Sequence, residues 1–193
     1  MAFRFYKRIR SLLKRRINAN KIGIKFTRSG RWNLPSKILI NNEPVKLNLV
    51  NDHSTSNTFI DVFLDDCYGL LFFKQHLHSV NTVVDIGANQ GLFVLFARNI
   101  FPAATIYAYE PNQSILPNLS YHAGIAKATY FNEAVGLTHG NITLHTGQDS
   151  LHGKTTLSDD GNIVQVSIRE CLARTSGNVD LLKLDCEAQN GKY

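Results

Sequence analysis

Cysteines are few in this sequence and long hydrophobic runs are absent, and both features exclude whole classes of protein. Cys67, Cys171 and Cys186 are odd in number and widely spaced, with no Cys-x-x-Cys pair. This pattern argues against a disulfide framework or a zinc site, and it suits a reducing cytosol. No stretch approaches ~18 consecutive apolar residues, which excludes a transmembrane helix, and the N-terminus lacks the features of a secretory signal. We therefore expect a cytoplasmic protein that holds no metal ion.

Acidic residues are missing from the first part of the chain. Residues 1–31 contain 11 of the 21 lysines and arginines and no aspartate or glutamate. The rest of the chain then carries 10 basic against 15 acidic residues, so the net charge of +6 belongs to one segment. Because the body is mildly acidic, we expect no nucleic-acid partner.

The basic segment has the pattern of an amphipathic helix. Phe5, Ile9, Leu12 or Leu13, and Ile17 recur at steps of three and four, with Arg and Lys between them. Such a helix can make peripheral contact with an anionic membrane surface. An ordinary surface helix whose apolar stripe docks on the body explains the pattern equally well. A mitochondrial transit peptide is a minor alternative.

Changes in pattern divide the chain of 193 residues into three parts. Residues 1–31 form the basic segment, residues 32–57 a region of short strands and loop, and residues 58–193 the main domain. Alternating apolar residues on either side of Asn41-Asn42-Glu43 predict a hairpin. The polar composition of residues 52–57 predicts a surface loop.

A strand followed by a glycine turn and a helix opens the main domain. Thr82–Ile86 is a β-branched run, Gly87-Ala-Asn-Gln-Gly91 follows it, and a helical rhythm begins at Leu92. This order is typical of the first unit of a doubly wound parallel sheet, whose ligands bind at the carboxyl ends of the strands. We assign Asp85, Gly87, Asn89 and Gly91 to a cofactor loop.

The glycine spacing discriminates between possible cofactors. Gly87 and Gly91 are separated by three residues, so the second glycine of the dinucleotide pattern G-x-G-x-x-G is absent. The preceding Asp85 would repel a pyrophosphate but suits a ligand that carries an ammonium group. S-adenosylmethionine (SAM) has an amino acid moiety and no phosphate, which favours it over NAD.

Polar residues at the ends of three further strands complete the predicted site. A second strand from Thr105 ends at Glu110, whose carboxylate can accept hydrogen bonds from ribose hydroxyls, with Asn112 close behind it. A third strand begins at Ala128 and ends near 132–136, and we expect Asn132 or Glu133 to lie close to the adenine. The fourth, 179–185, ends in an acidic pair that would face the sulfonium and the substrate: Asp185 and Glu187.

Four motifs together resemble the FkbM-type methyltransferases. They are VVDIGANQGLF at 83–93, YAYEPN at 107–112, NEAVG at 132–136 and LLKLDCE at 181–187. The resemblance covers roughly residues 60–187. It implies a Rossmann-like, SAM-dependent methyltransferase fold of the α/β class, with a mostly parallel sheet and helices on both faces. It also implies O-methylation of a hydroxyl on a sugar, glycolipid or related metabolite.

Two departures from this family's pattern accompany the resemblance. The family continues the last motif as Glu-Gly-Ala-Glu, whereas this chain reads Glu187-Ala-Gln-Asn-Gly-Lys-Tyr193. Domains of this family resemble folds built on a seven-stranded sheet, and we expect strands five to seven of that sheet to be missing here. A truncated, catalytically inactive fragment that acts only by binding is therefore an alternative. An NAD-dependent oxidoreductase is a weaker one.

The predicted reaction needs a general base, because an alcohol is a poor nucleophile at neutral pH. Asp185 is the first candidate for this role and Glu187 the second. The partner is expected to be a small-molecule or glycan hydroxyl acceptor. The histidines are expected to be solvated surface residues instead of catalytic ones: His122, His139, His145 and His152.

Overall fold

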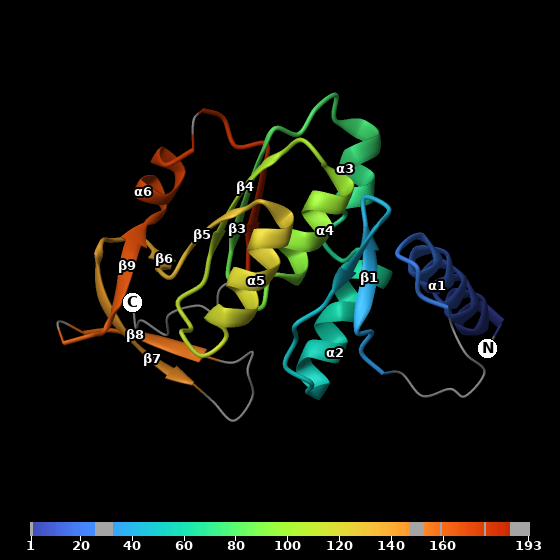
Figure 1. Cartoon of the computed structure of the whole chain (residues 1–193), viewed down its shortest axis with the longest axis horizontal. Coiled ribbons are helices and arrows are strands. Elements are labelled where there is room, and N and C mark those ends of the chain that lie inside the picture. Colours follow the sequence, from blue (N-terminus) through green and yellow to red (C-terminus); the bar gives the residue numbers. More distant parts are fainter. Residues whose placement is uncertain (1, 26–32, 147–152, 159, 176, 186–193) are drawn as a thin grey trace.

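The computed structural model describes residues 2–25, 33–146, 153–158, 160–175 and 177–185, and Figure 1 shows their arrangement. The elements in chain order are α1 Ala2–Lys21, β1 Lys37–Ile40, β2 Glu43–Lys46, α2 His53–Phe59, the π-helix η1 Ile60–Leu64, α3 Leu70–His76, β3 Thr82–Ile86, α4 Leu92–Ile100, β4 Thr105–Tyr109, α5 Leu116–Ala126, β5 Thr129–Phe131, β6 Ala134–Gly136, β7 Gly140–Thr146, β8 Gly153–Leu157, β9 Ile163–Ser167, α6 Ile168–Ala173 and β10 Leu181–Leu184.

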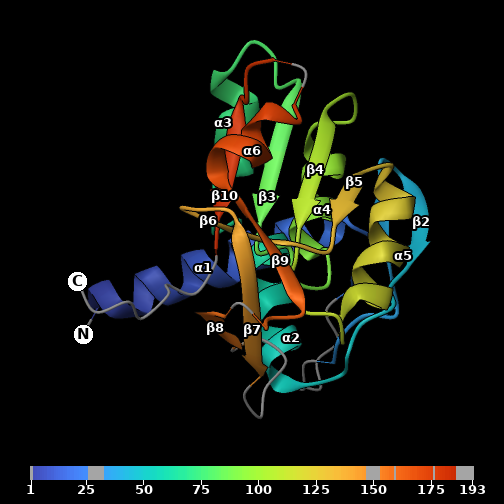
Figure 2. The same cartoon turned by 90° about the vertical axis from the view of Figure 1, so that its left-hand side faces the viewer.

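A four-stranded parallel sheet forms the centre of the molecule. Its strand order is β10-β3-β4-β5, and all three pairs are parallel. Strands β3, β4 and β5 lie side by side in Figure 2. All five residues of β3 are buried, as expected for a central strand covered on both faces. The predicted α/β class and Rossmann-like parallel sheet are confirmed.

The two faces of the parallel sheet bury different sets of side chains. On one face, Val83, Ile106 and Ala108 pack in a core with helices α4 and α5. On the other face, Val84, Ile86 and Tyr109 pack with Val166 and Cys171 of β9 and α6. Figure 1 shows α4 and α5 on one side of β3 and β4, and α6 with β9 on the other. Helices therefore cover both faces, as predicted, and part of a second sheet shares one of them.

A second, mixed sheet was not predicted from the sequence. It has the order β6-β9-β7-β8 and is inserted between β5 and α6. The predicted end of the third strand, near Asn132–Gly136, is divided: β5 stays in the parallel sheet and β6 pairs with β9. Ser167 and Glu170 form a reciprocal capping box that begins α6 directly after β9.

The region before the parallel sheet confirms one prediction and corrects another. Strands β1 and β2 form the predicted antiparallel hairpin, and Asn41 and Asn42 both have the positive φ that a tight two-residue turn requires. The loop predicted at residues 52–57 is wrong, because His53–Phe59 is helix α2. The Asp52 Oδ1 accepts a hydrogen bond from Thr55 N at 2.6 Å and so caps the N-terminus of this helix. The polar residues thus belong to a capped helix.

The basic segment forms the predicted helix. Helix α1 ends at Lys21, and Gly23 follows with a φ of 76°, a conformation that favours glycine. Ala19 and Ile22 are buried in the same core as α4. No helix in the described part of the chain is long and apolar enough to span a bilayer.

Candidate functional site

A cavity of about 350 Å³ opens at the carboxyl ends of the parallel strands. Its wall is formed by the turn after β3, the residues after β4, the start of β6, the end of β10 and the segment 58–68. Leu144 of β7 also lines it, so the second sheet contributes to the wall. This is the position at which sheets of this class bind ligands, and the volume lies within the range of small-molecule sites.

The turn after β3 is held in a fixed shape by backbone contacts. Gly87 has a φ of 80°, and the amides of Gly87 and Ala88 both donate to Tyr109 O at 3.0 Å. Asn89 has a φ of 49° and lies in the left-handed region, which asparagine tolerates better than most residues. Gly87, Ala88 and Asn89 all line the cavity, so a ligand meets backbone there instead of bulky side chains.

Glu110 is the best-defined polar group of the cavity. Its Oε2 accepts a hydrogen bond from Asn89 N and its Oε1 accepts one from Asn112 N, each at 2.8 Å. The residue is only 7% exposed, and burial raises the pKa of its carboxyl, an effect that the two backbone N–H groups oppose. The two donors fix the carboxylate against the turn after β3. Each oxygen retains a lone pair with which it can accept a further hydrogen bond.

Asp85 forms a buried ion pair beneath the loop. Asp85 is fully buried, and its Oδ1 accepts a hydrogen bond from Lys183 Nζ at 2.8 Å. Lys183 lies directly opposite Asp85 in the β3–β10 register and also donates to Gly87 O at 2.9 Å. Burial raises the pKa of the Asp85 carboxyl, and the charge of Lys183 opposes that shift. The other oxygen, Oδ2, is buried without a hydrogen-bond partner in the described part of the chain.

The end of β10 contributes a second carboxylate. Asp185 Oδ2 accepts a hydrogen bond from the Tyr68 hydroxyl at 2.6 Å and lies 3.7 Å from Lys183 Nζ. The Asp185 side chain is 62% exposed and lines the cavity together with Tyr68 and Lys183. Burial is the main reason why the pKa of Tyr68 is raised, with Asp185 adding to it, so the hydroxyl stays protonated and keeps donating.

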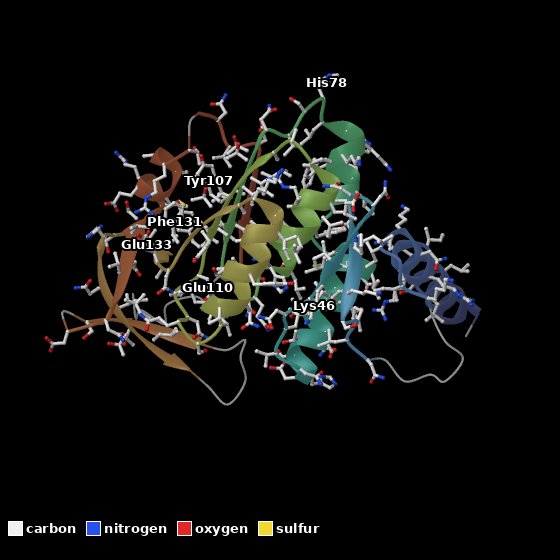
Figure 3. The ribbon with its side chains drawn as sticks, in the orientation of Figure 1. Lys46, His78, Tyr107, Glu110, Phe131 and Glu133 are labelled. Carbon is white, nitrogen blue, oxygen red and sulfur yellow. The ribbon has the colours of Figure 1, made fainter. Side chains whose placement is uncertain are left out.

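An aromatic and charged cluster lies where β4 and β5 end. Tyr109 and Phe131 stack with ring centroids 4.7 Å apart, and the Arg174 guanidinium lies 4.6 Å from the Phe131 centroid. Arg174 also binds both carboxylate oxygens of Glu133, one of them at 3.2 Å. Figure 3 labels Glu110, Phe131 and Glu133 in this region. Tyr109 and Glu133 line the cavity, which gives it a flat aromatic element beside an ion pair.

His122 supports the Gly87–Gly91 turn from behind, and its predicted place on the solvated surface is wrong. The residue is fully buried in α5. Its Nδ1 donates to Gln90 O at 2.6 Å and its Nε2 accepts from Asn48 N at 3.1 Å. These partners require the neutral ring, and burial lowers its pKa. His139 is exposed and close to Glu170, whereas the His145 side chain and His152 lie outside the described residues.

The structure brings most of the predicted site residues to one cavity. Asp185 and five of the predicted cofactor residues line it: Gly87, Asn89, Glu110, Asn112 and Glu133. The other three described residues lie behind the wall. Asp85 binds Lys183, Gly91 begins helix α4, and the Asn132 amide donates to Glu110 O at 2.8 Å. Glu187 lies outside the described residues.

Lys183 and Tyr68 are the functional candidates that sequence reasoning missed. Lys183 stands in an otherwise apolar strand, and a buried lysine requires a partner, so its presence beside a buried Asp85 was a readable signal. Tyr68 comes from the turn before α3 and carries no comparable signal. Cys67 lines the cavity nearby, and burial raises the pKa of its thiol to about 11, which disfavours the thiolate near neutral pH. The described residues contain no cluster of metal-binding side chains.

Comparison with known proteins adds one similarity. No protein-family model matches the chain. Over 62 residues the chain is 37% identical to 31-O-demethyl-FK506 methyltransferase FkbM of Streptomyces tacrolimicus. The matched stretch covers 32% of this chain and 23% of that protein, so the chain spans about a quarter of the length of the curated relative it matches.

Proposed function

We propose that this chain is a methyltransferase of the FkbM type that binds SAM in the cavity beside the Gly87–Gly91 turn. We further propose that it methylates a hydroxyl oxygen of a sugar, glycolipid or related metabolite. The observation that carries the proposal is the placement of Glu110 and Asp185 in the same cavity at the ends of the parallel strands. The similarity to a methyltransferase supports the reaction class.

The residues of the cavity fit the parts of this cofactor. Glu110 is held by two backbone amides with lone pairs to spare, which suits a pair of ribose hydroxyls. Apolar and aromatic residues, among them Tyr109, Ile115 and Val135, suit a flat adenine ring. The turn lacks the middle glycine of the dinucleotide pattern, which disfavours a pyrophosphate there. The turn and Glu110 are therefore the residues that we expect to hold the cofactor.

When bound, SAM supplies a methyl group made electrophilic by the attached sulfonium. The protein then has to position the acceptor oxygen and remove its proton. Asp185 is the carboxylate that we assign to this role. Tyr68 occupies Oδ2 and orients the side chain, so Oδ1 is the oxygen that we expect to take the proton. The Lys183 Nζ lies 3.7 Å from Oδ2 on the same side of the carboxylate as Tyr68.

Calorimetric titration with SAM tests the cofactor site. Glu110→Gln keeps the shape of the side chain but removes its charge. A hydrogen bond to a charged group is worth ~1.5–3 kcal/mol, so the variant should bind about 10- to 100-fold more weakly. Glu43→Gln, at an exposed hairpin position, is the matched control and should bind as the wild-type protein does. Binding of NAD without binding of SAM would overturn the proposal.

Methyl transfer from labelled SAM to a panel of sugars and glycolipids tests the reaction. General-base catalysis contributes about 10²- to 10⁴-fold, and Asp185→Asn should lose a factor in that range while its SAM affinity is unchanged. Tyr68→Phe leaves the carboxylate in place but frees its Oδ2, so we expect a smaller loss. Full turnover in Asp185→Asn would refute the assignment of the base and leave the cofactor site standing.

A further inference from the structure

Helix α1 is attached to the body by its polar side. The Arg15 guanidinium binds both oxygens of Asp65 at 2.7 and 2.6 Å, and the Asn18 amide donates to Leu64 O at 2.8 Å. Lys14 donates to the backbone oxygen of Asp65. Leu64 and Asp65 lie at the end of η1, so a short segment of the body receives nearly all of these bonds.

The apolar residues of α1 whose side chains are described therefore face solvent. Leu12, Leu13 and Ile17 are 57%, 54% and 57% exposed, although each is a large hydrophobic residue. Exposed cations, Arg16 and Lys21, lie among and beside them. Figures 1 and 2 both show α1 at the periphery of the molecule. Of the two equally good interpretations of the sequence pattern, the structure disfavours the one in which the apolar stripe docks on the body.

We propose that this face of α1 binds an anionic lipid bilayer, with the helix lying in the plane of the membrane surface. An exposed apolar stripe flanked by basic residues matches both the hydrocarbon boundary and the negative headgroups of such a surface. The sequence adds Arg4, Lys7, Arg8 and Arg10 within the same helix and no acidic residue. A nucleic acid would use the cations but would gain nothing from three exposed aliphatic side chains.

The attachment point of α1 also connects this surface with the cavity. Asp65, which holds Arg15, lies in the chain between the cavity residues Val62 and Cys67. A bilayer bound to α1 would therefore be joined to the wall of the cavity by a few ordered residues. If the proposed function holds, this arrangement favours an acceptor hydroxyl that is itself attached to a lipid, an inference that rests on that function. The binding of the bilayer does not depend on that reaction.

Vesicle flotation of the full chain tests the proposal without any measurement of activity. The vesicles are phosphatidylcholine alone, or phosphatidylcholine with phosphatidylglycerol. We expect flotation with the anionic vesicles at low salt and its loss at about 1 M salt, where the Debye length falls to ~3 Å. The double variant Leu13→Gln/Ile17→Gln should partition at least about tenfold more weakly, since two half-exposed aliphatic side chains no longer enter the interface. Leu137→Gln, at a position 82% exposed outside α1, is the control and should float as the wild-type protein does.

Each other result counts against the proposal. Equal flotation with neutral vesicles, or none with either kind, would overturn it. So would undiminished flotation of the double variant. A dimer in solution that the double variant abolishes, without flotation, would show that a second copy covers the face. Because the salt dependence is measured on the wild-type chain, the test holds even where the double variant folds poorly. Absence of SAM binding leaves the result unaffected, so failure of the proposed function is seen separately.

Discussion

Replacement of Lys183 by methionine should destabilise the protein strongly. Lys183 is 8% exposed and Asp85 is fully buried, so the substitution keeps most of the side-chain volume but leaves a buried carboxylate without its counter-ion. Removing one partner of a buried ion pair costs about 3–5 kcal/mol. For a domain of this size each kcal/mol lowers the Tm by about 2–4 °C, so we expect a loss of roughly 6–20 °C. Thermal unfolding followed by circular dichroism measures it.

The pH dependence of this loss identifies its cause. Without Lys183, burial and the nearby charge of Asp185 both act on Asp85 and hold its folded-state pKa further above the unfolded value of about 3.9. A group with a raised folded-state pKa costs no stability in acid, where it is protonated in both the folded and the unfolded state. Its cost grows as the pH rises toward the folded-state pKa, by at most about 1.4 kcal/mol per pH unit. The difference in Tm between the wild-type protein and Lys183→Met should therefore be larger at pH 8 than at pH 5.

Two further variants make the reasoning refutable. Asp85→Asn/Lys183→Met removes both charges and should recover part of the lost stability, since replacing a whole buried pair costs far less than breaking it. Lys74→Met, at an exposed position of α3, should change the Tm by no more than about 2 °C. A Lys183→Met variant as stable as the wild-type protein, or a loss independent of pH, would show that the ion pair does not bear on stability.

Other predictions concern the support of the cofactor loop and α5. In Gly91→Ala the added Cβ would meet His122 Cβ at 3.1 Å, whereas the control Gly69→Ala has the same kind of positive φ but open space around the new Cβ. Calorimetry should show that Gly91→Ala is the less stable variant by about 1 kcal/mol or more. Equal losses of stability in the two variants would contradict this. Gly124→Ala lies inside helix α5 with nothing within 4 Å, so denaturant unfolding should show a gain of about 0.5–1 kcal/mol. Because the pKa of His122 is lowered in the folded state, its neutral ring stabilises the fold above pH ~6.5, and this stabilisation is lost as the pH falls below that value. The difference in Tm between the wild-type protein and His122→Asn should therefore shrink between about pH 7 and pH 5.

The parallel sheet could be predicted closely because its signal is local. Thr82–Ile86 is β3 with the predicted bounds, and β4 ends one residue before the predicted Glu110. The predicted end of the third strand is divided between β5 and β6. A short run rich in β-branched and aromatic residues that ends at a glycine or proline turn favours a buried strand over a buried helix. The cavity then follows from topology, since parallel strands place their carboxyl ends, and hence Glu110 and Asp185, at one edge.

What the sequence does not reveal is mostly long-range. The second sheet pairs β6 with β9 and β7 with both β8 and β9, and no local pattern sets those partners. The polar run at 52–57 is a helix because Asp52 caps it and because the residues that follow, such as Phe59, are buried. A local sequence pattern can place His122 in a helix. It cannot show that the segment after β2, which includes Asn48, packs against α5 and makes His122 a buried support of the turn.

The pairing of Asp85 with Lys183 changes the reason for preferring SAM to a dinucleotide. From the sequence, the unpaired charge of Asp85 both repels phosphate and attracts an ammonium group. In the structure that charge is matched by Lys183 at 2.8 Å and lies behind the wall of the cavity. The discrimination therefore rests on the glycine spacing of the turn, because a carboxylate at the position of Glu110 serves the ribose of either cofactor. Asp85 and Lys183 act instead on the turn itself, since Lys183 binds Gly87 O at 2.9 Å and joins the backbone of the turn to both strands beneath it. Loss of the pair should consequently weaken SAM binding through disorder of the turn, and SAM should raise the Tm of Lys183→Met by less than it raises that of the wild-type protein.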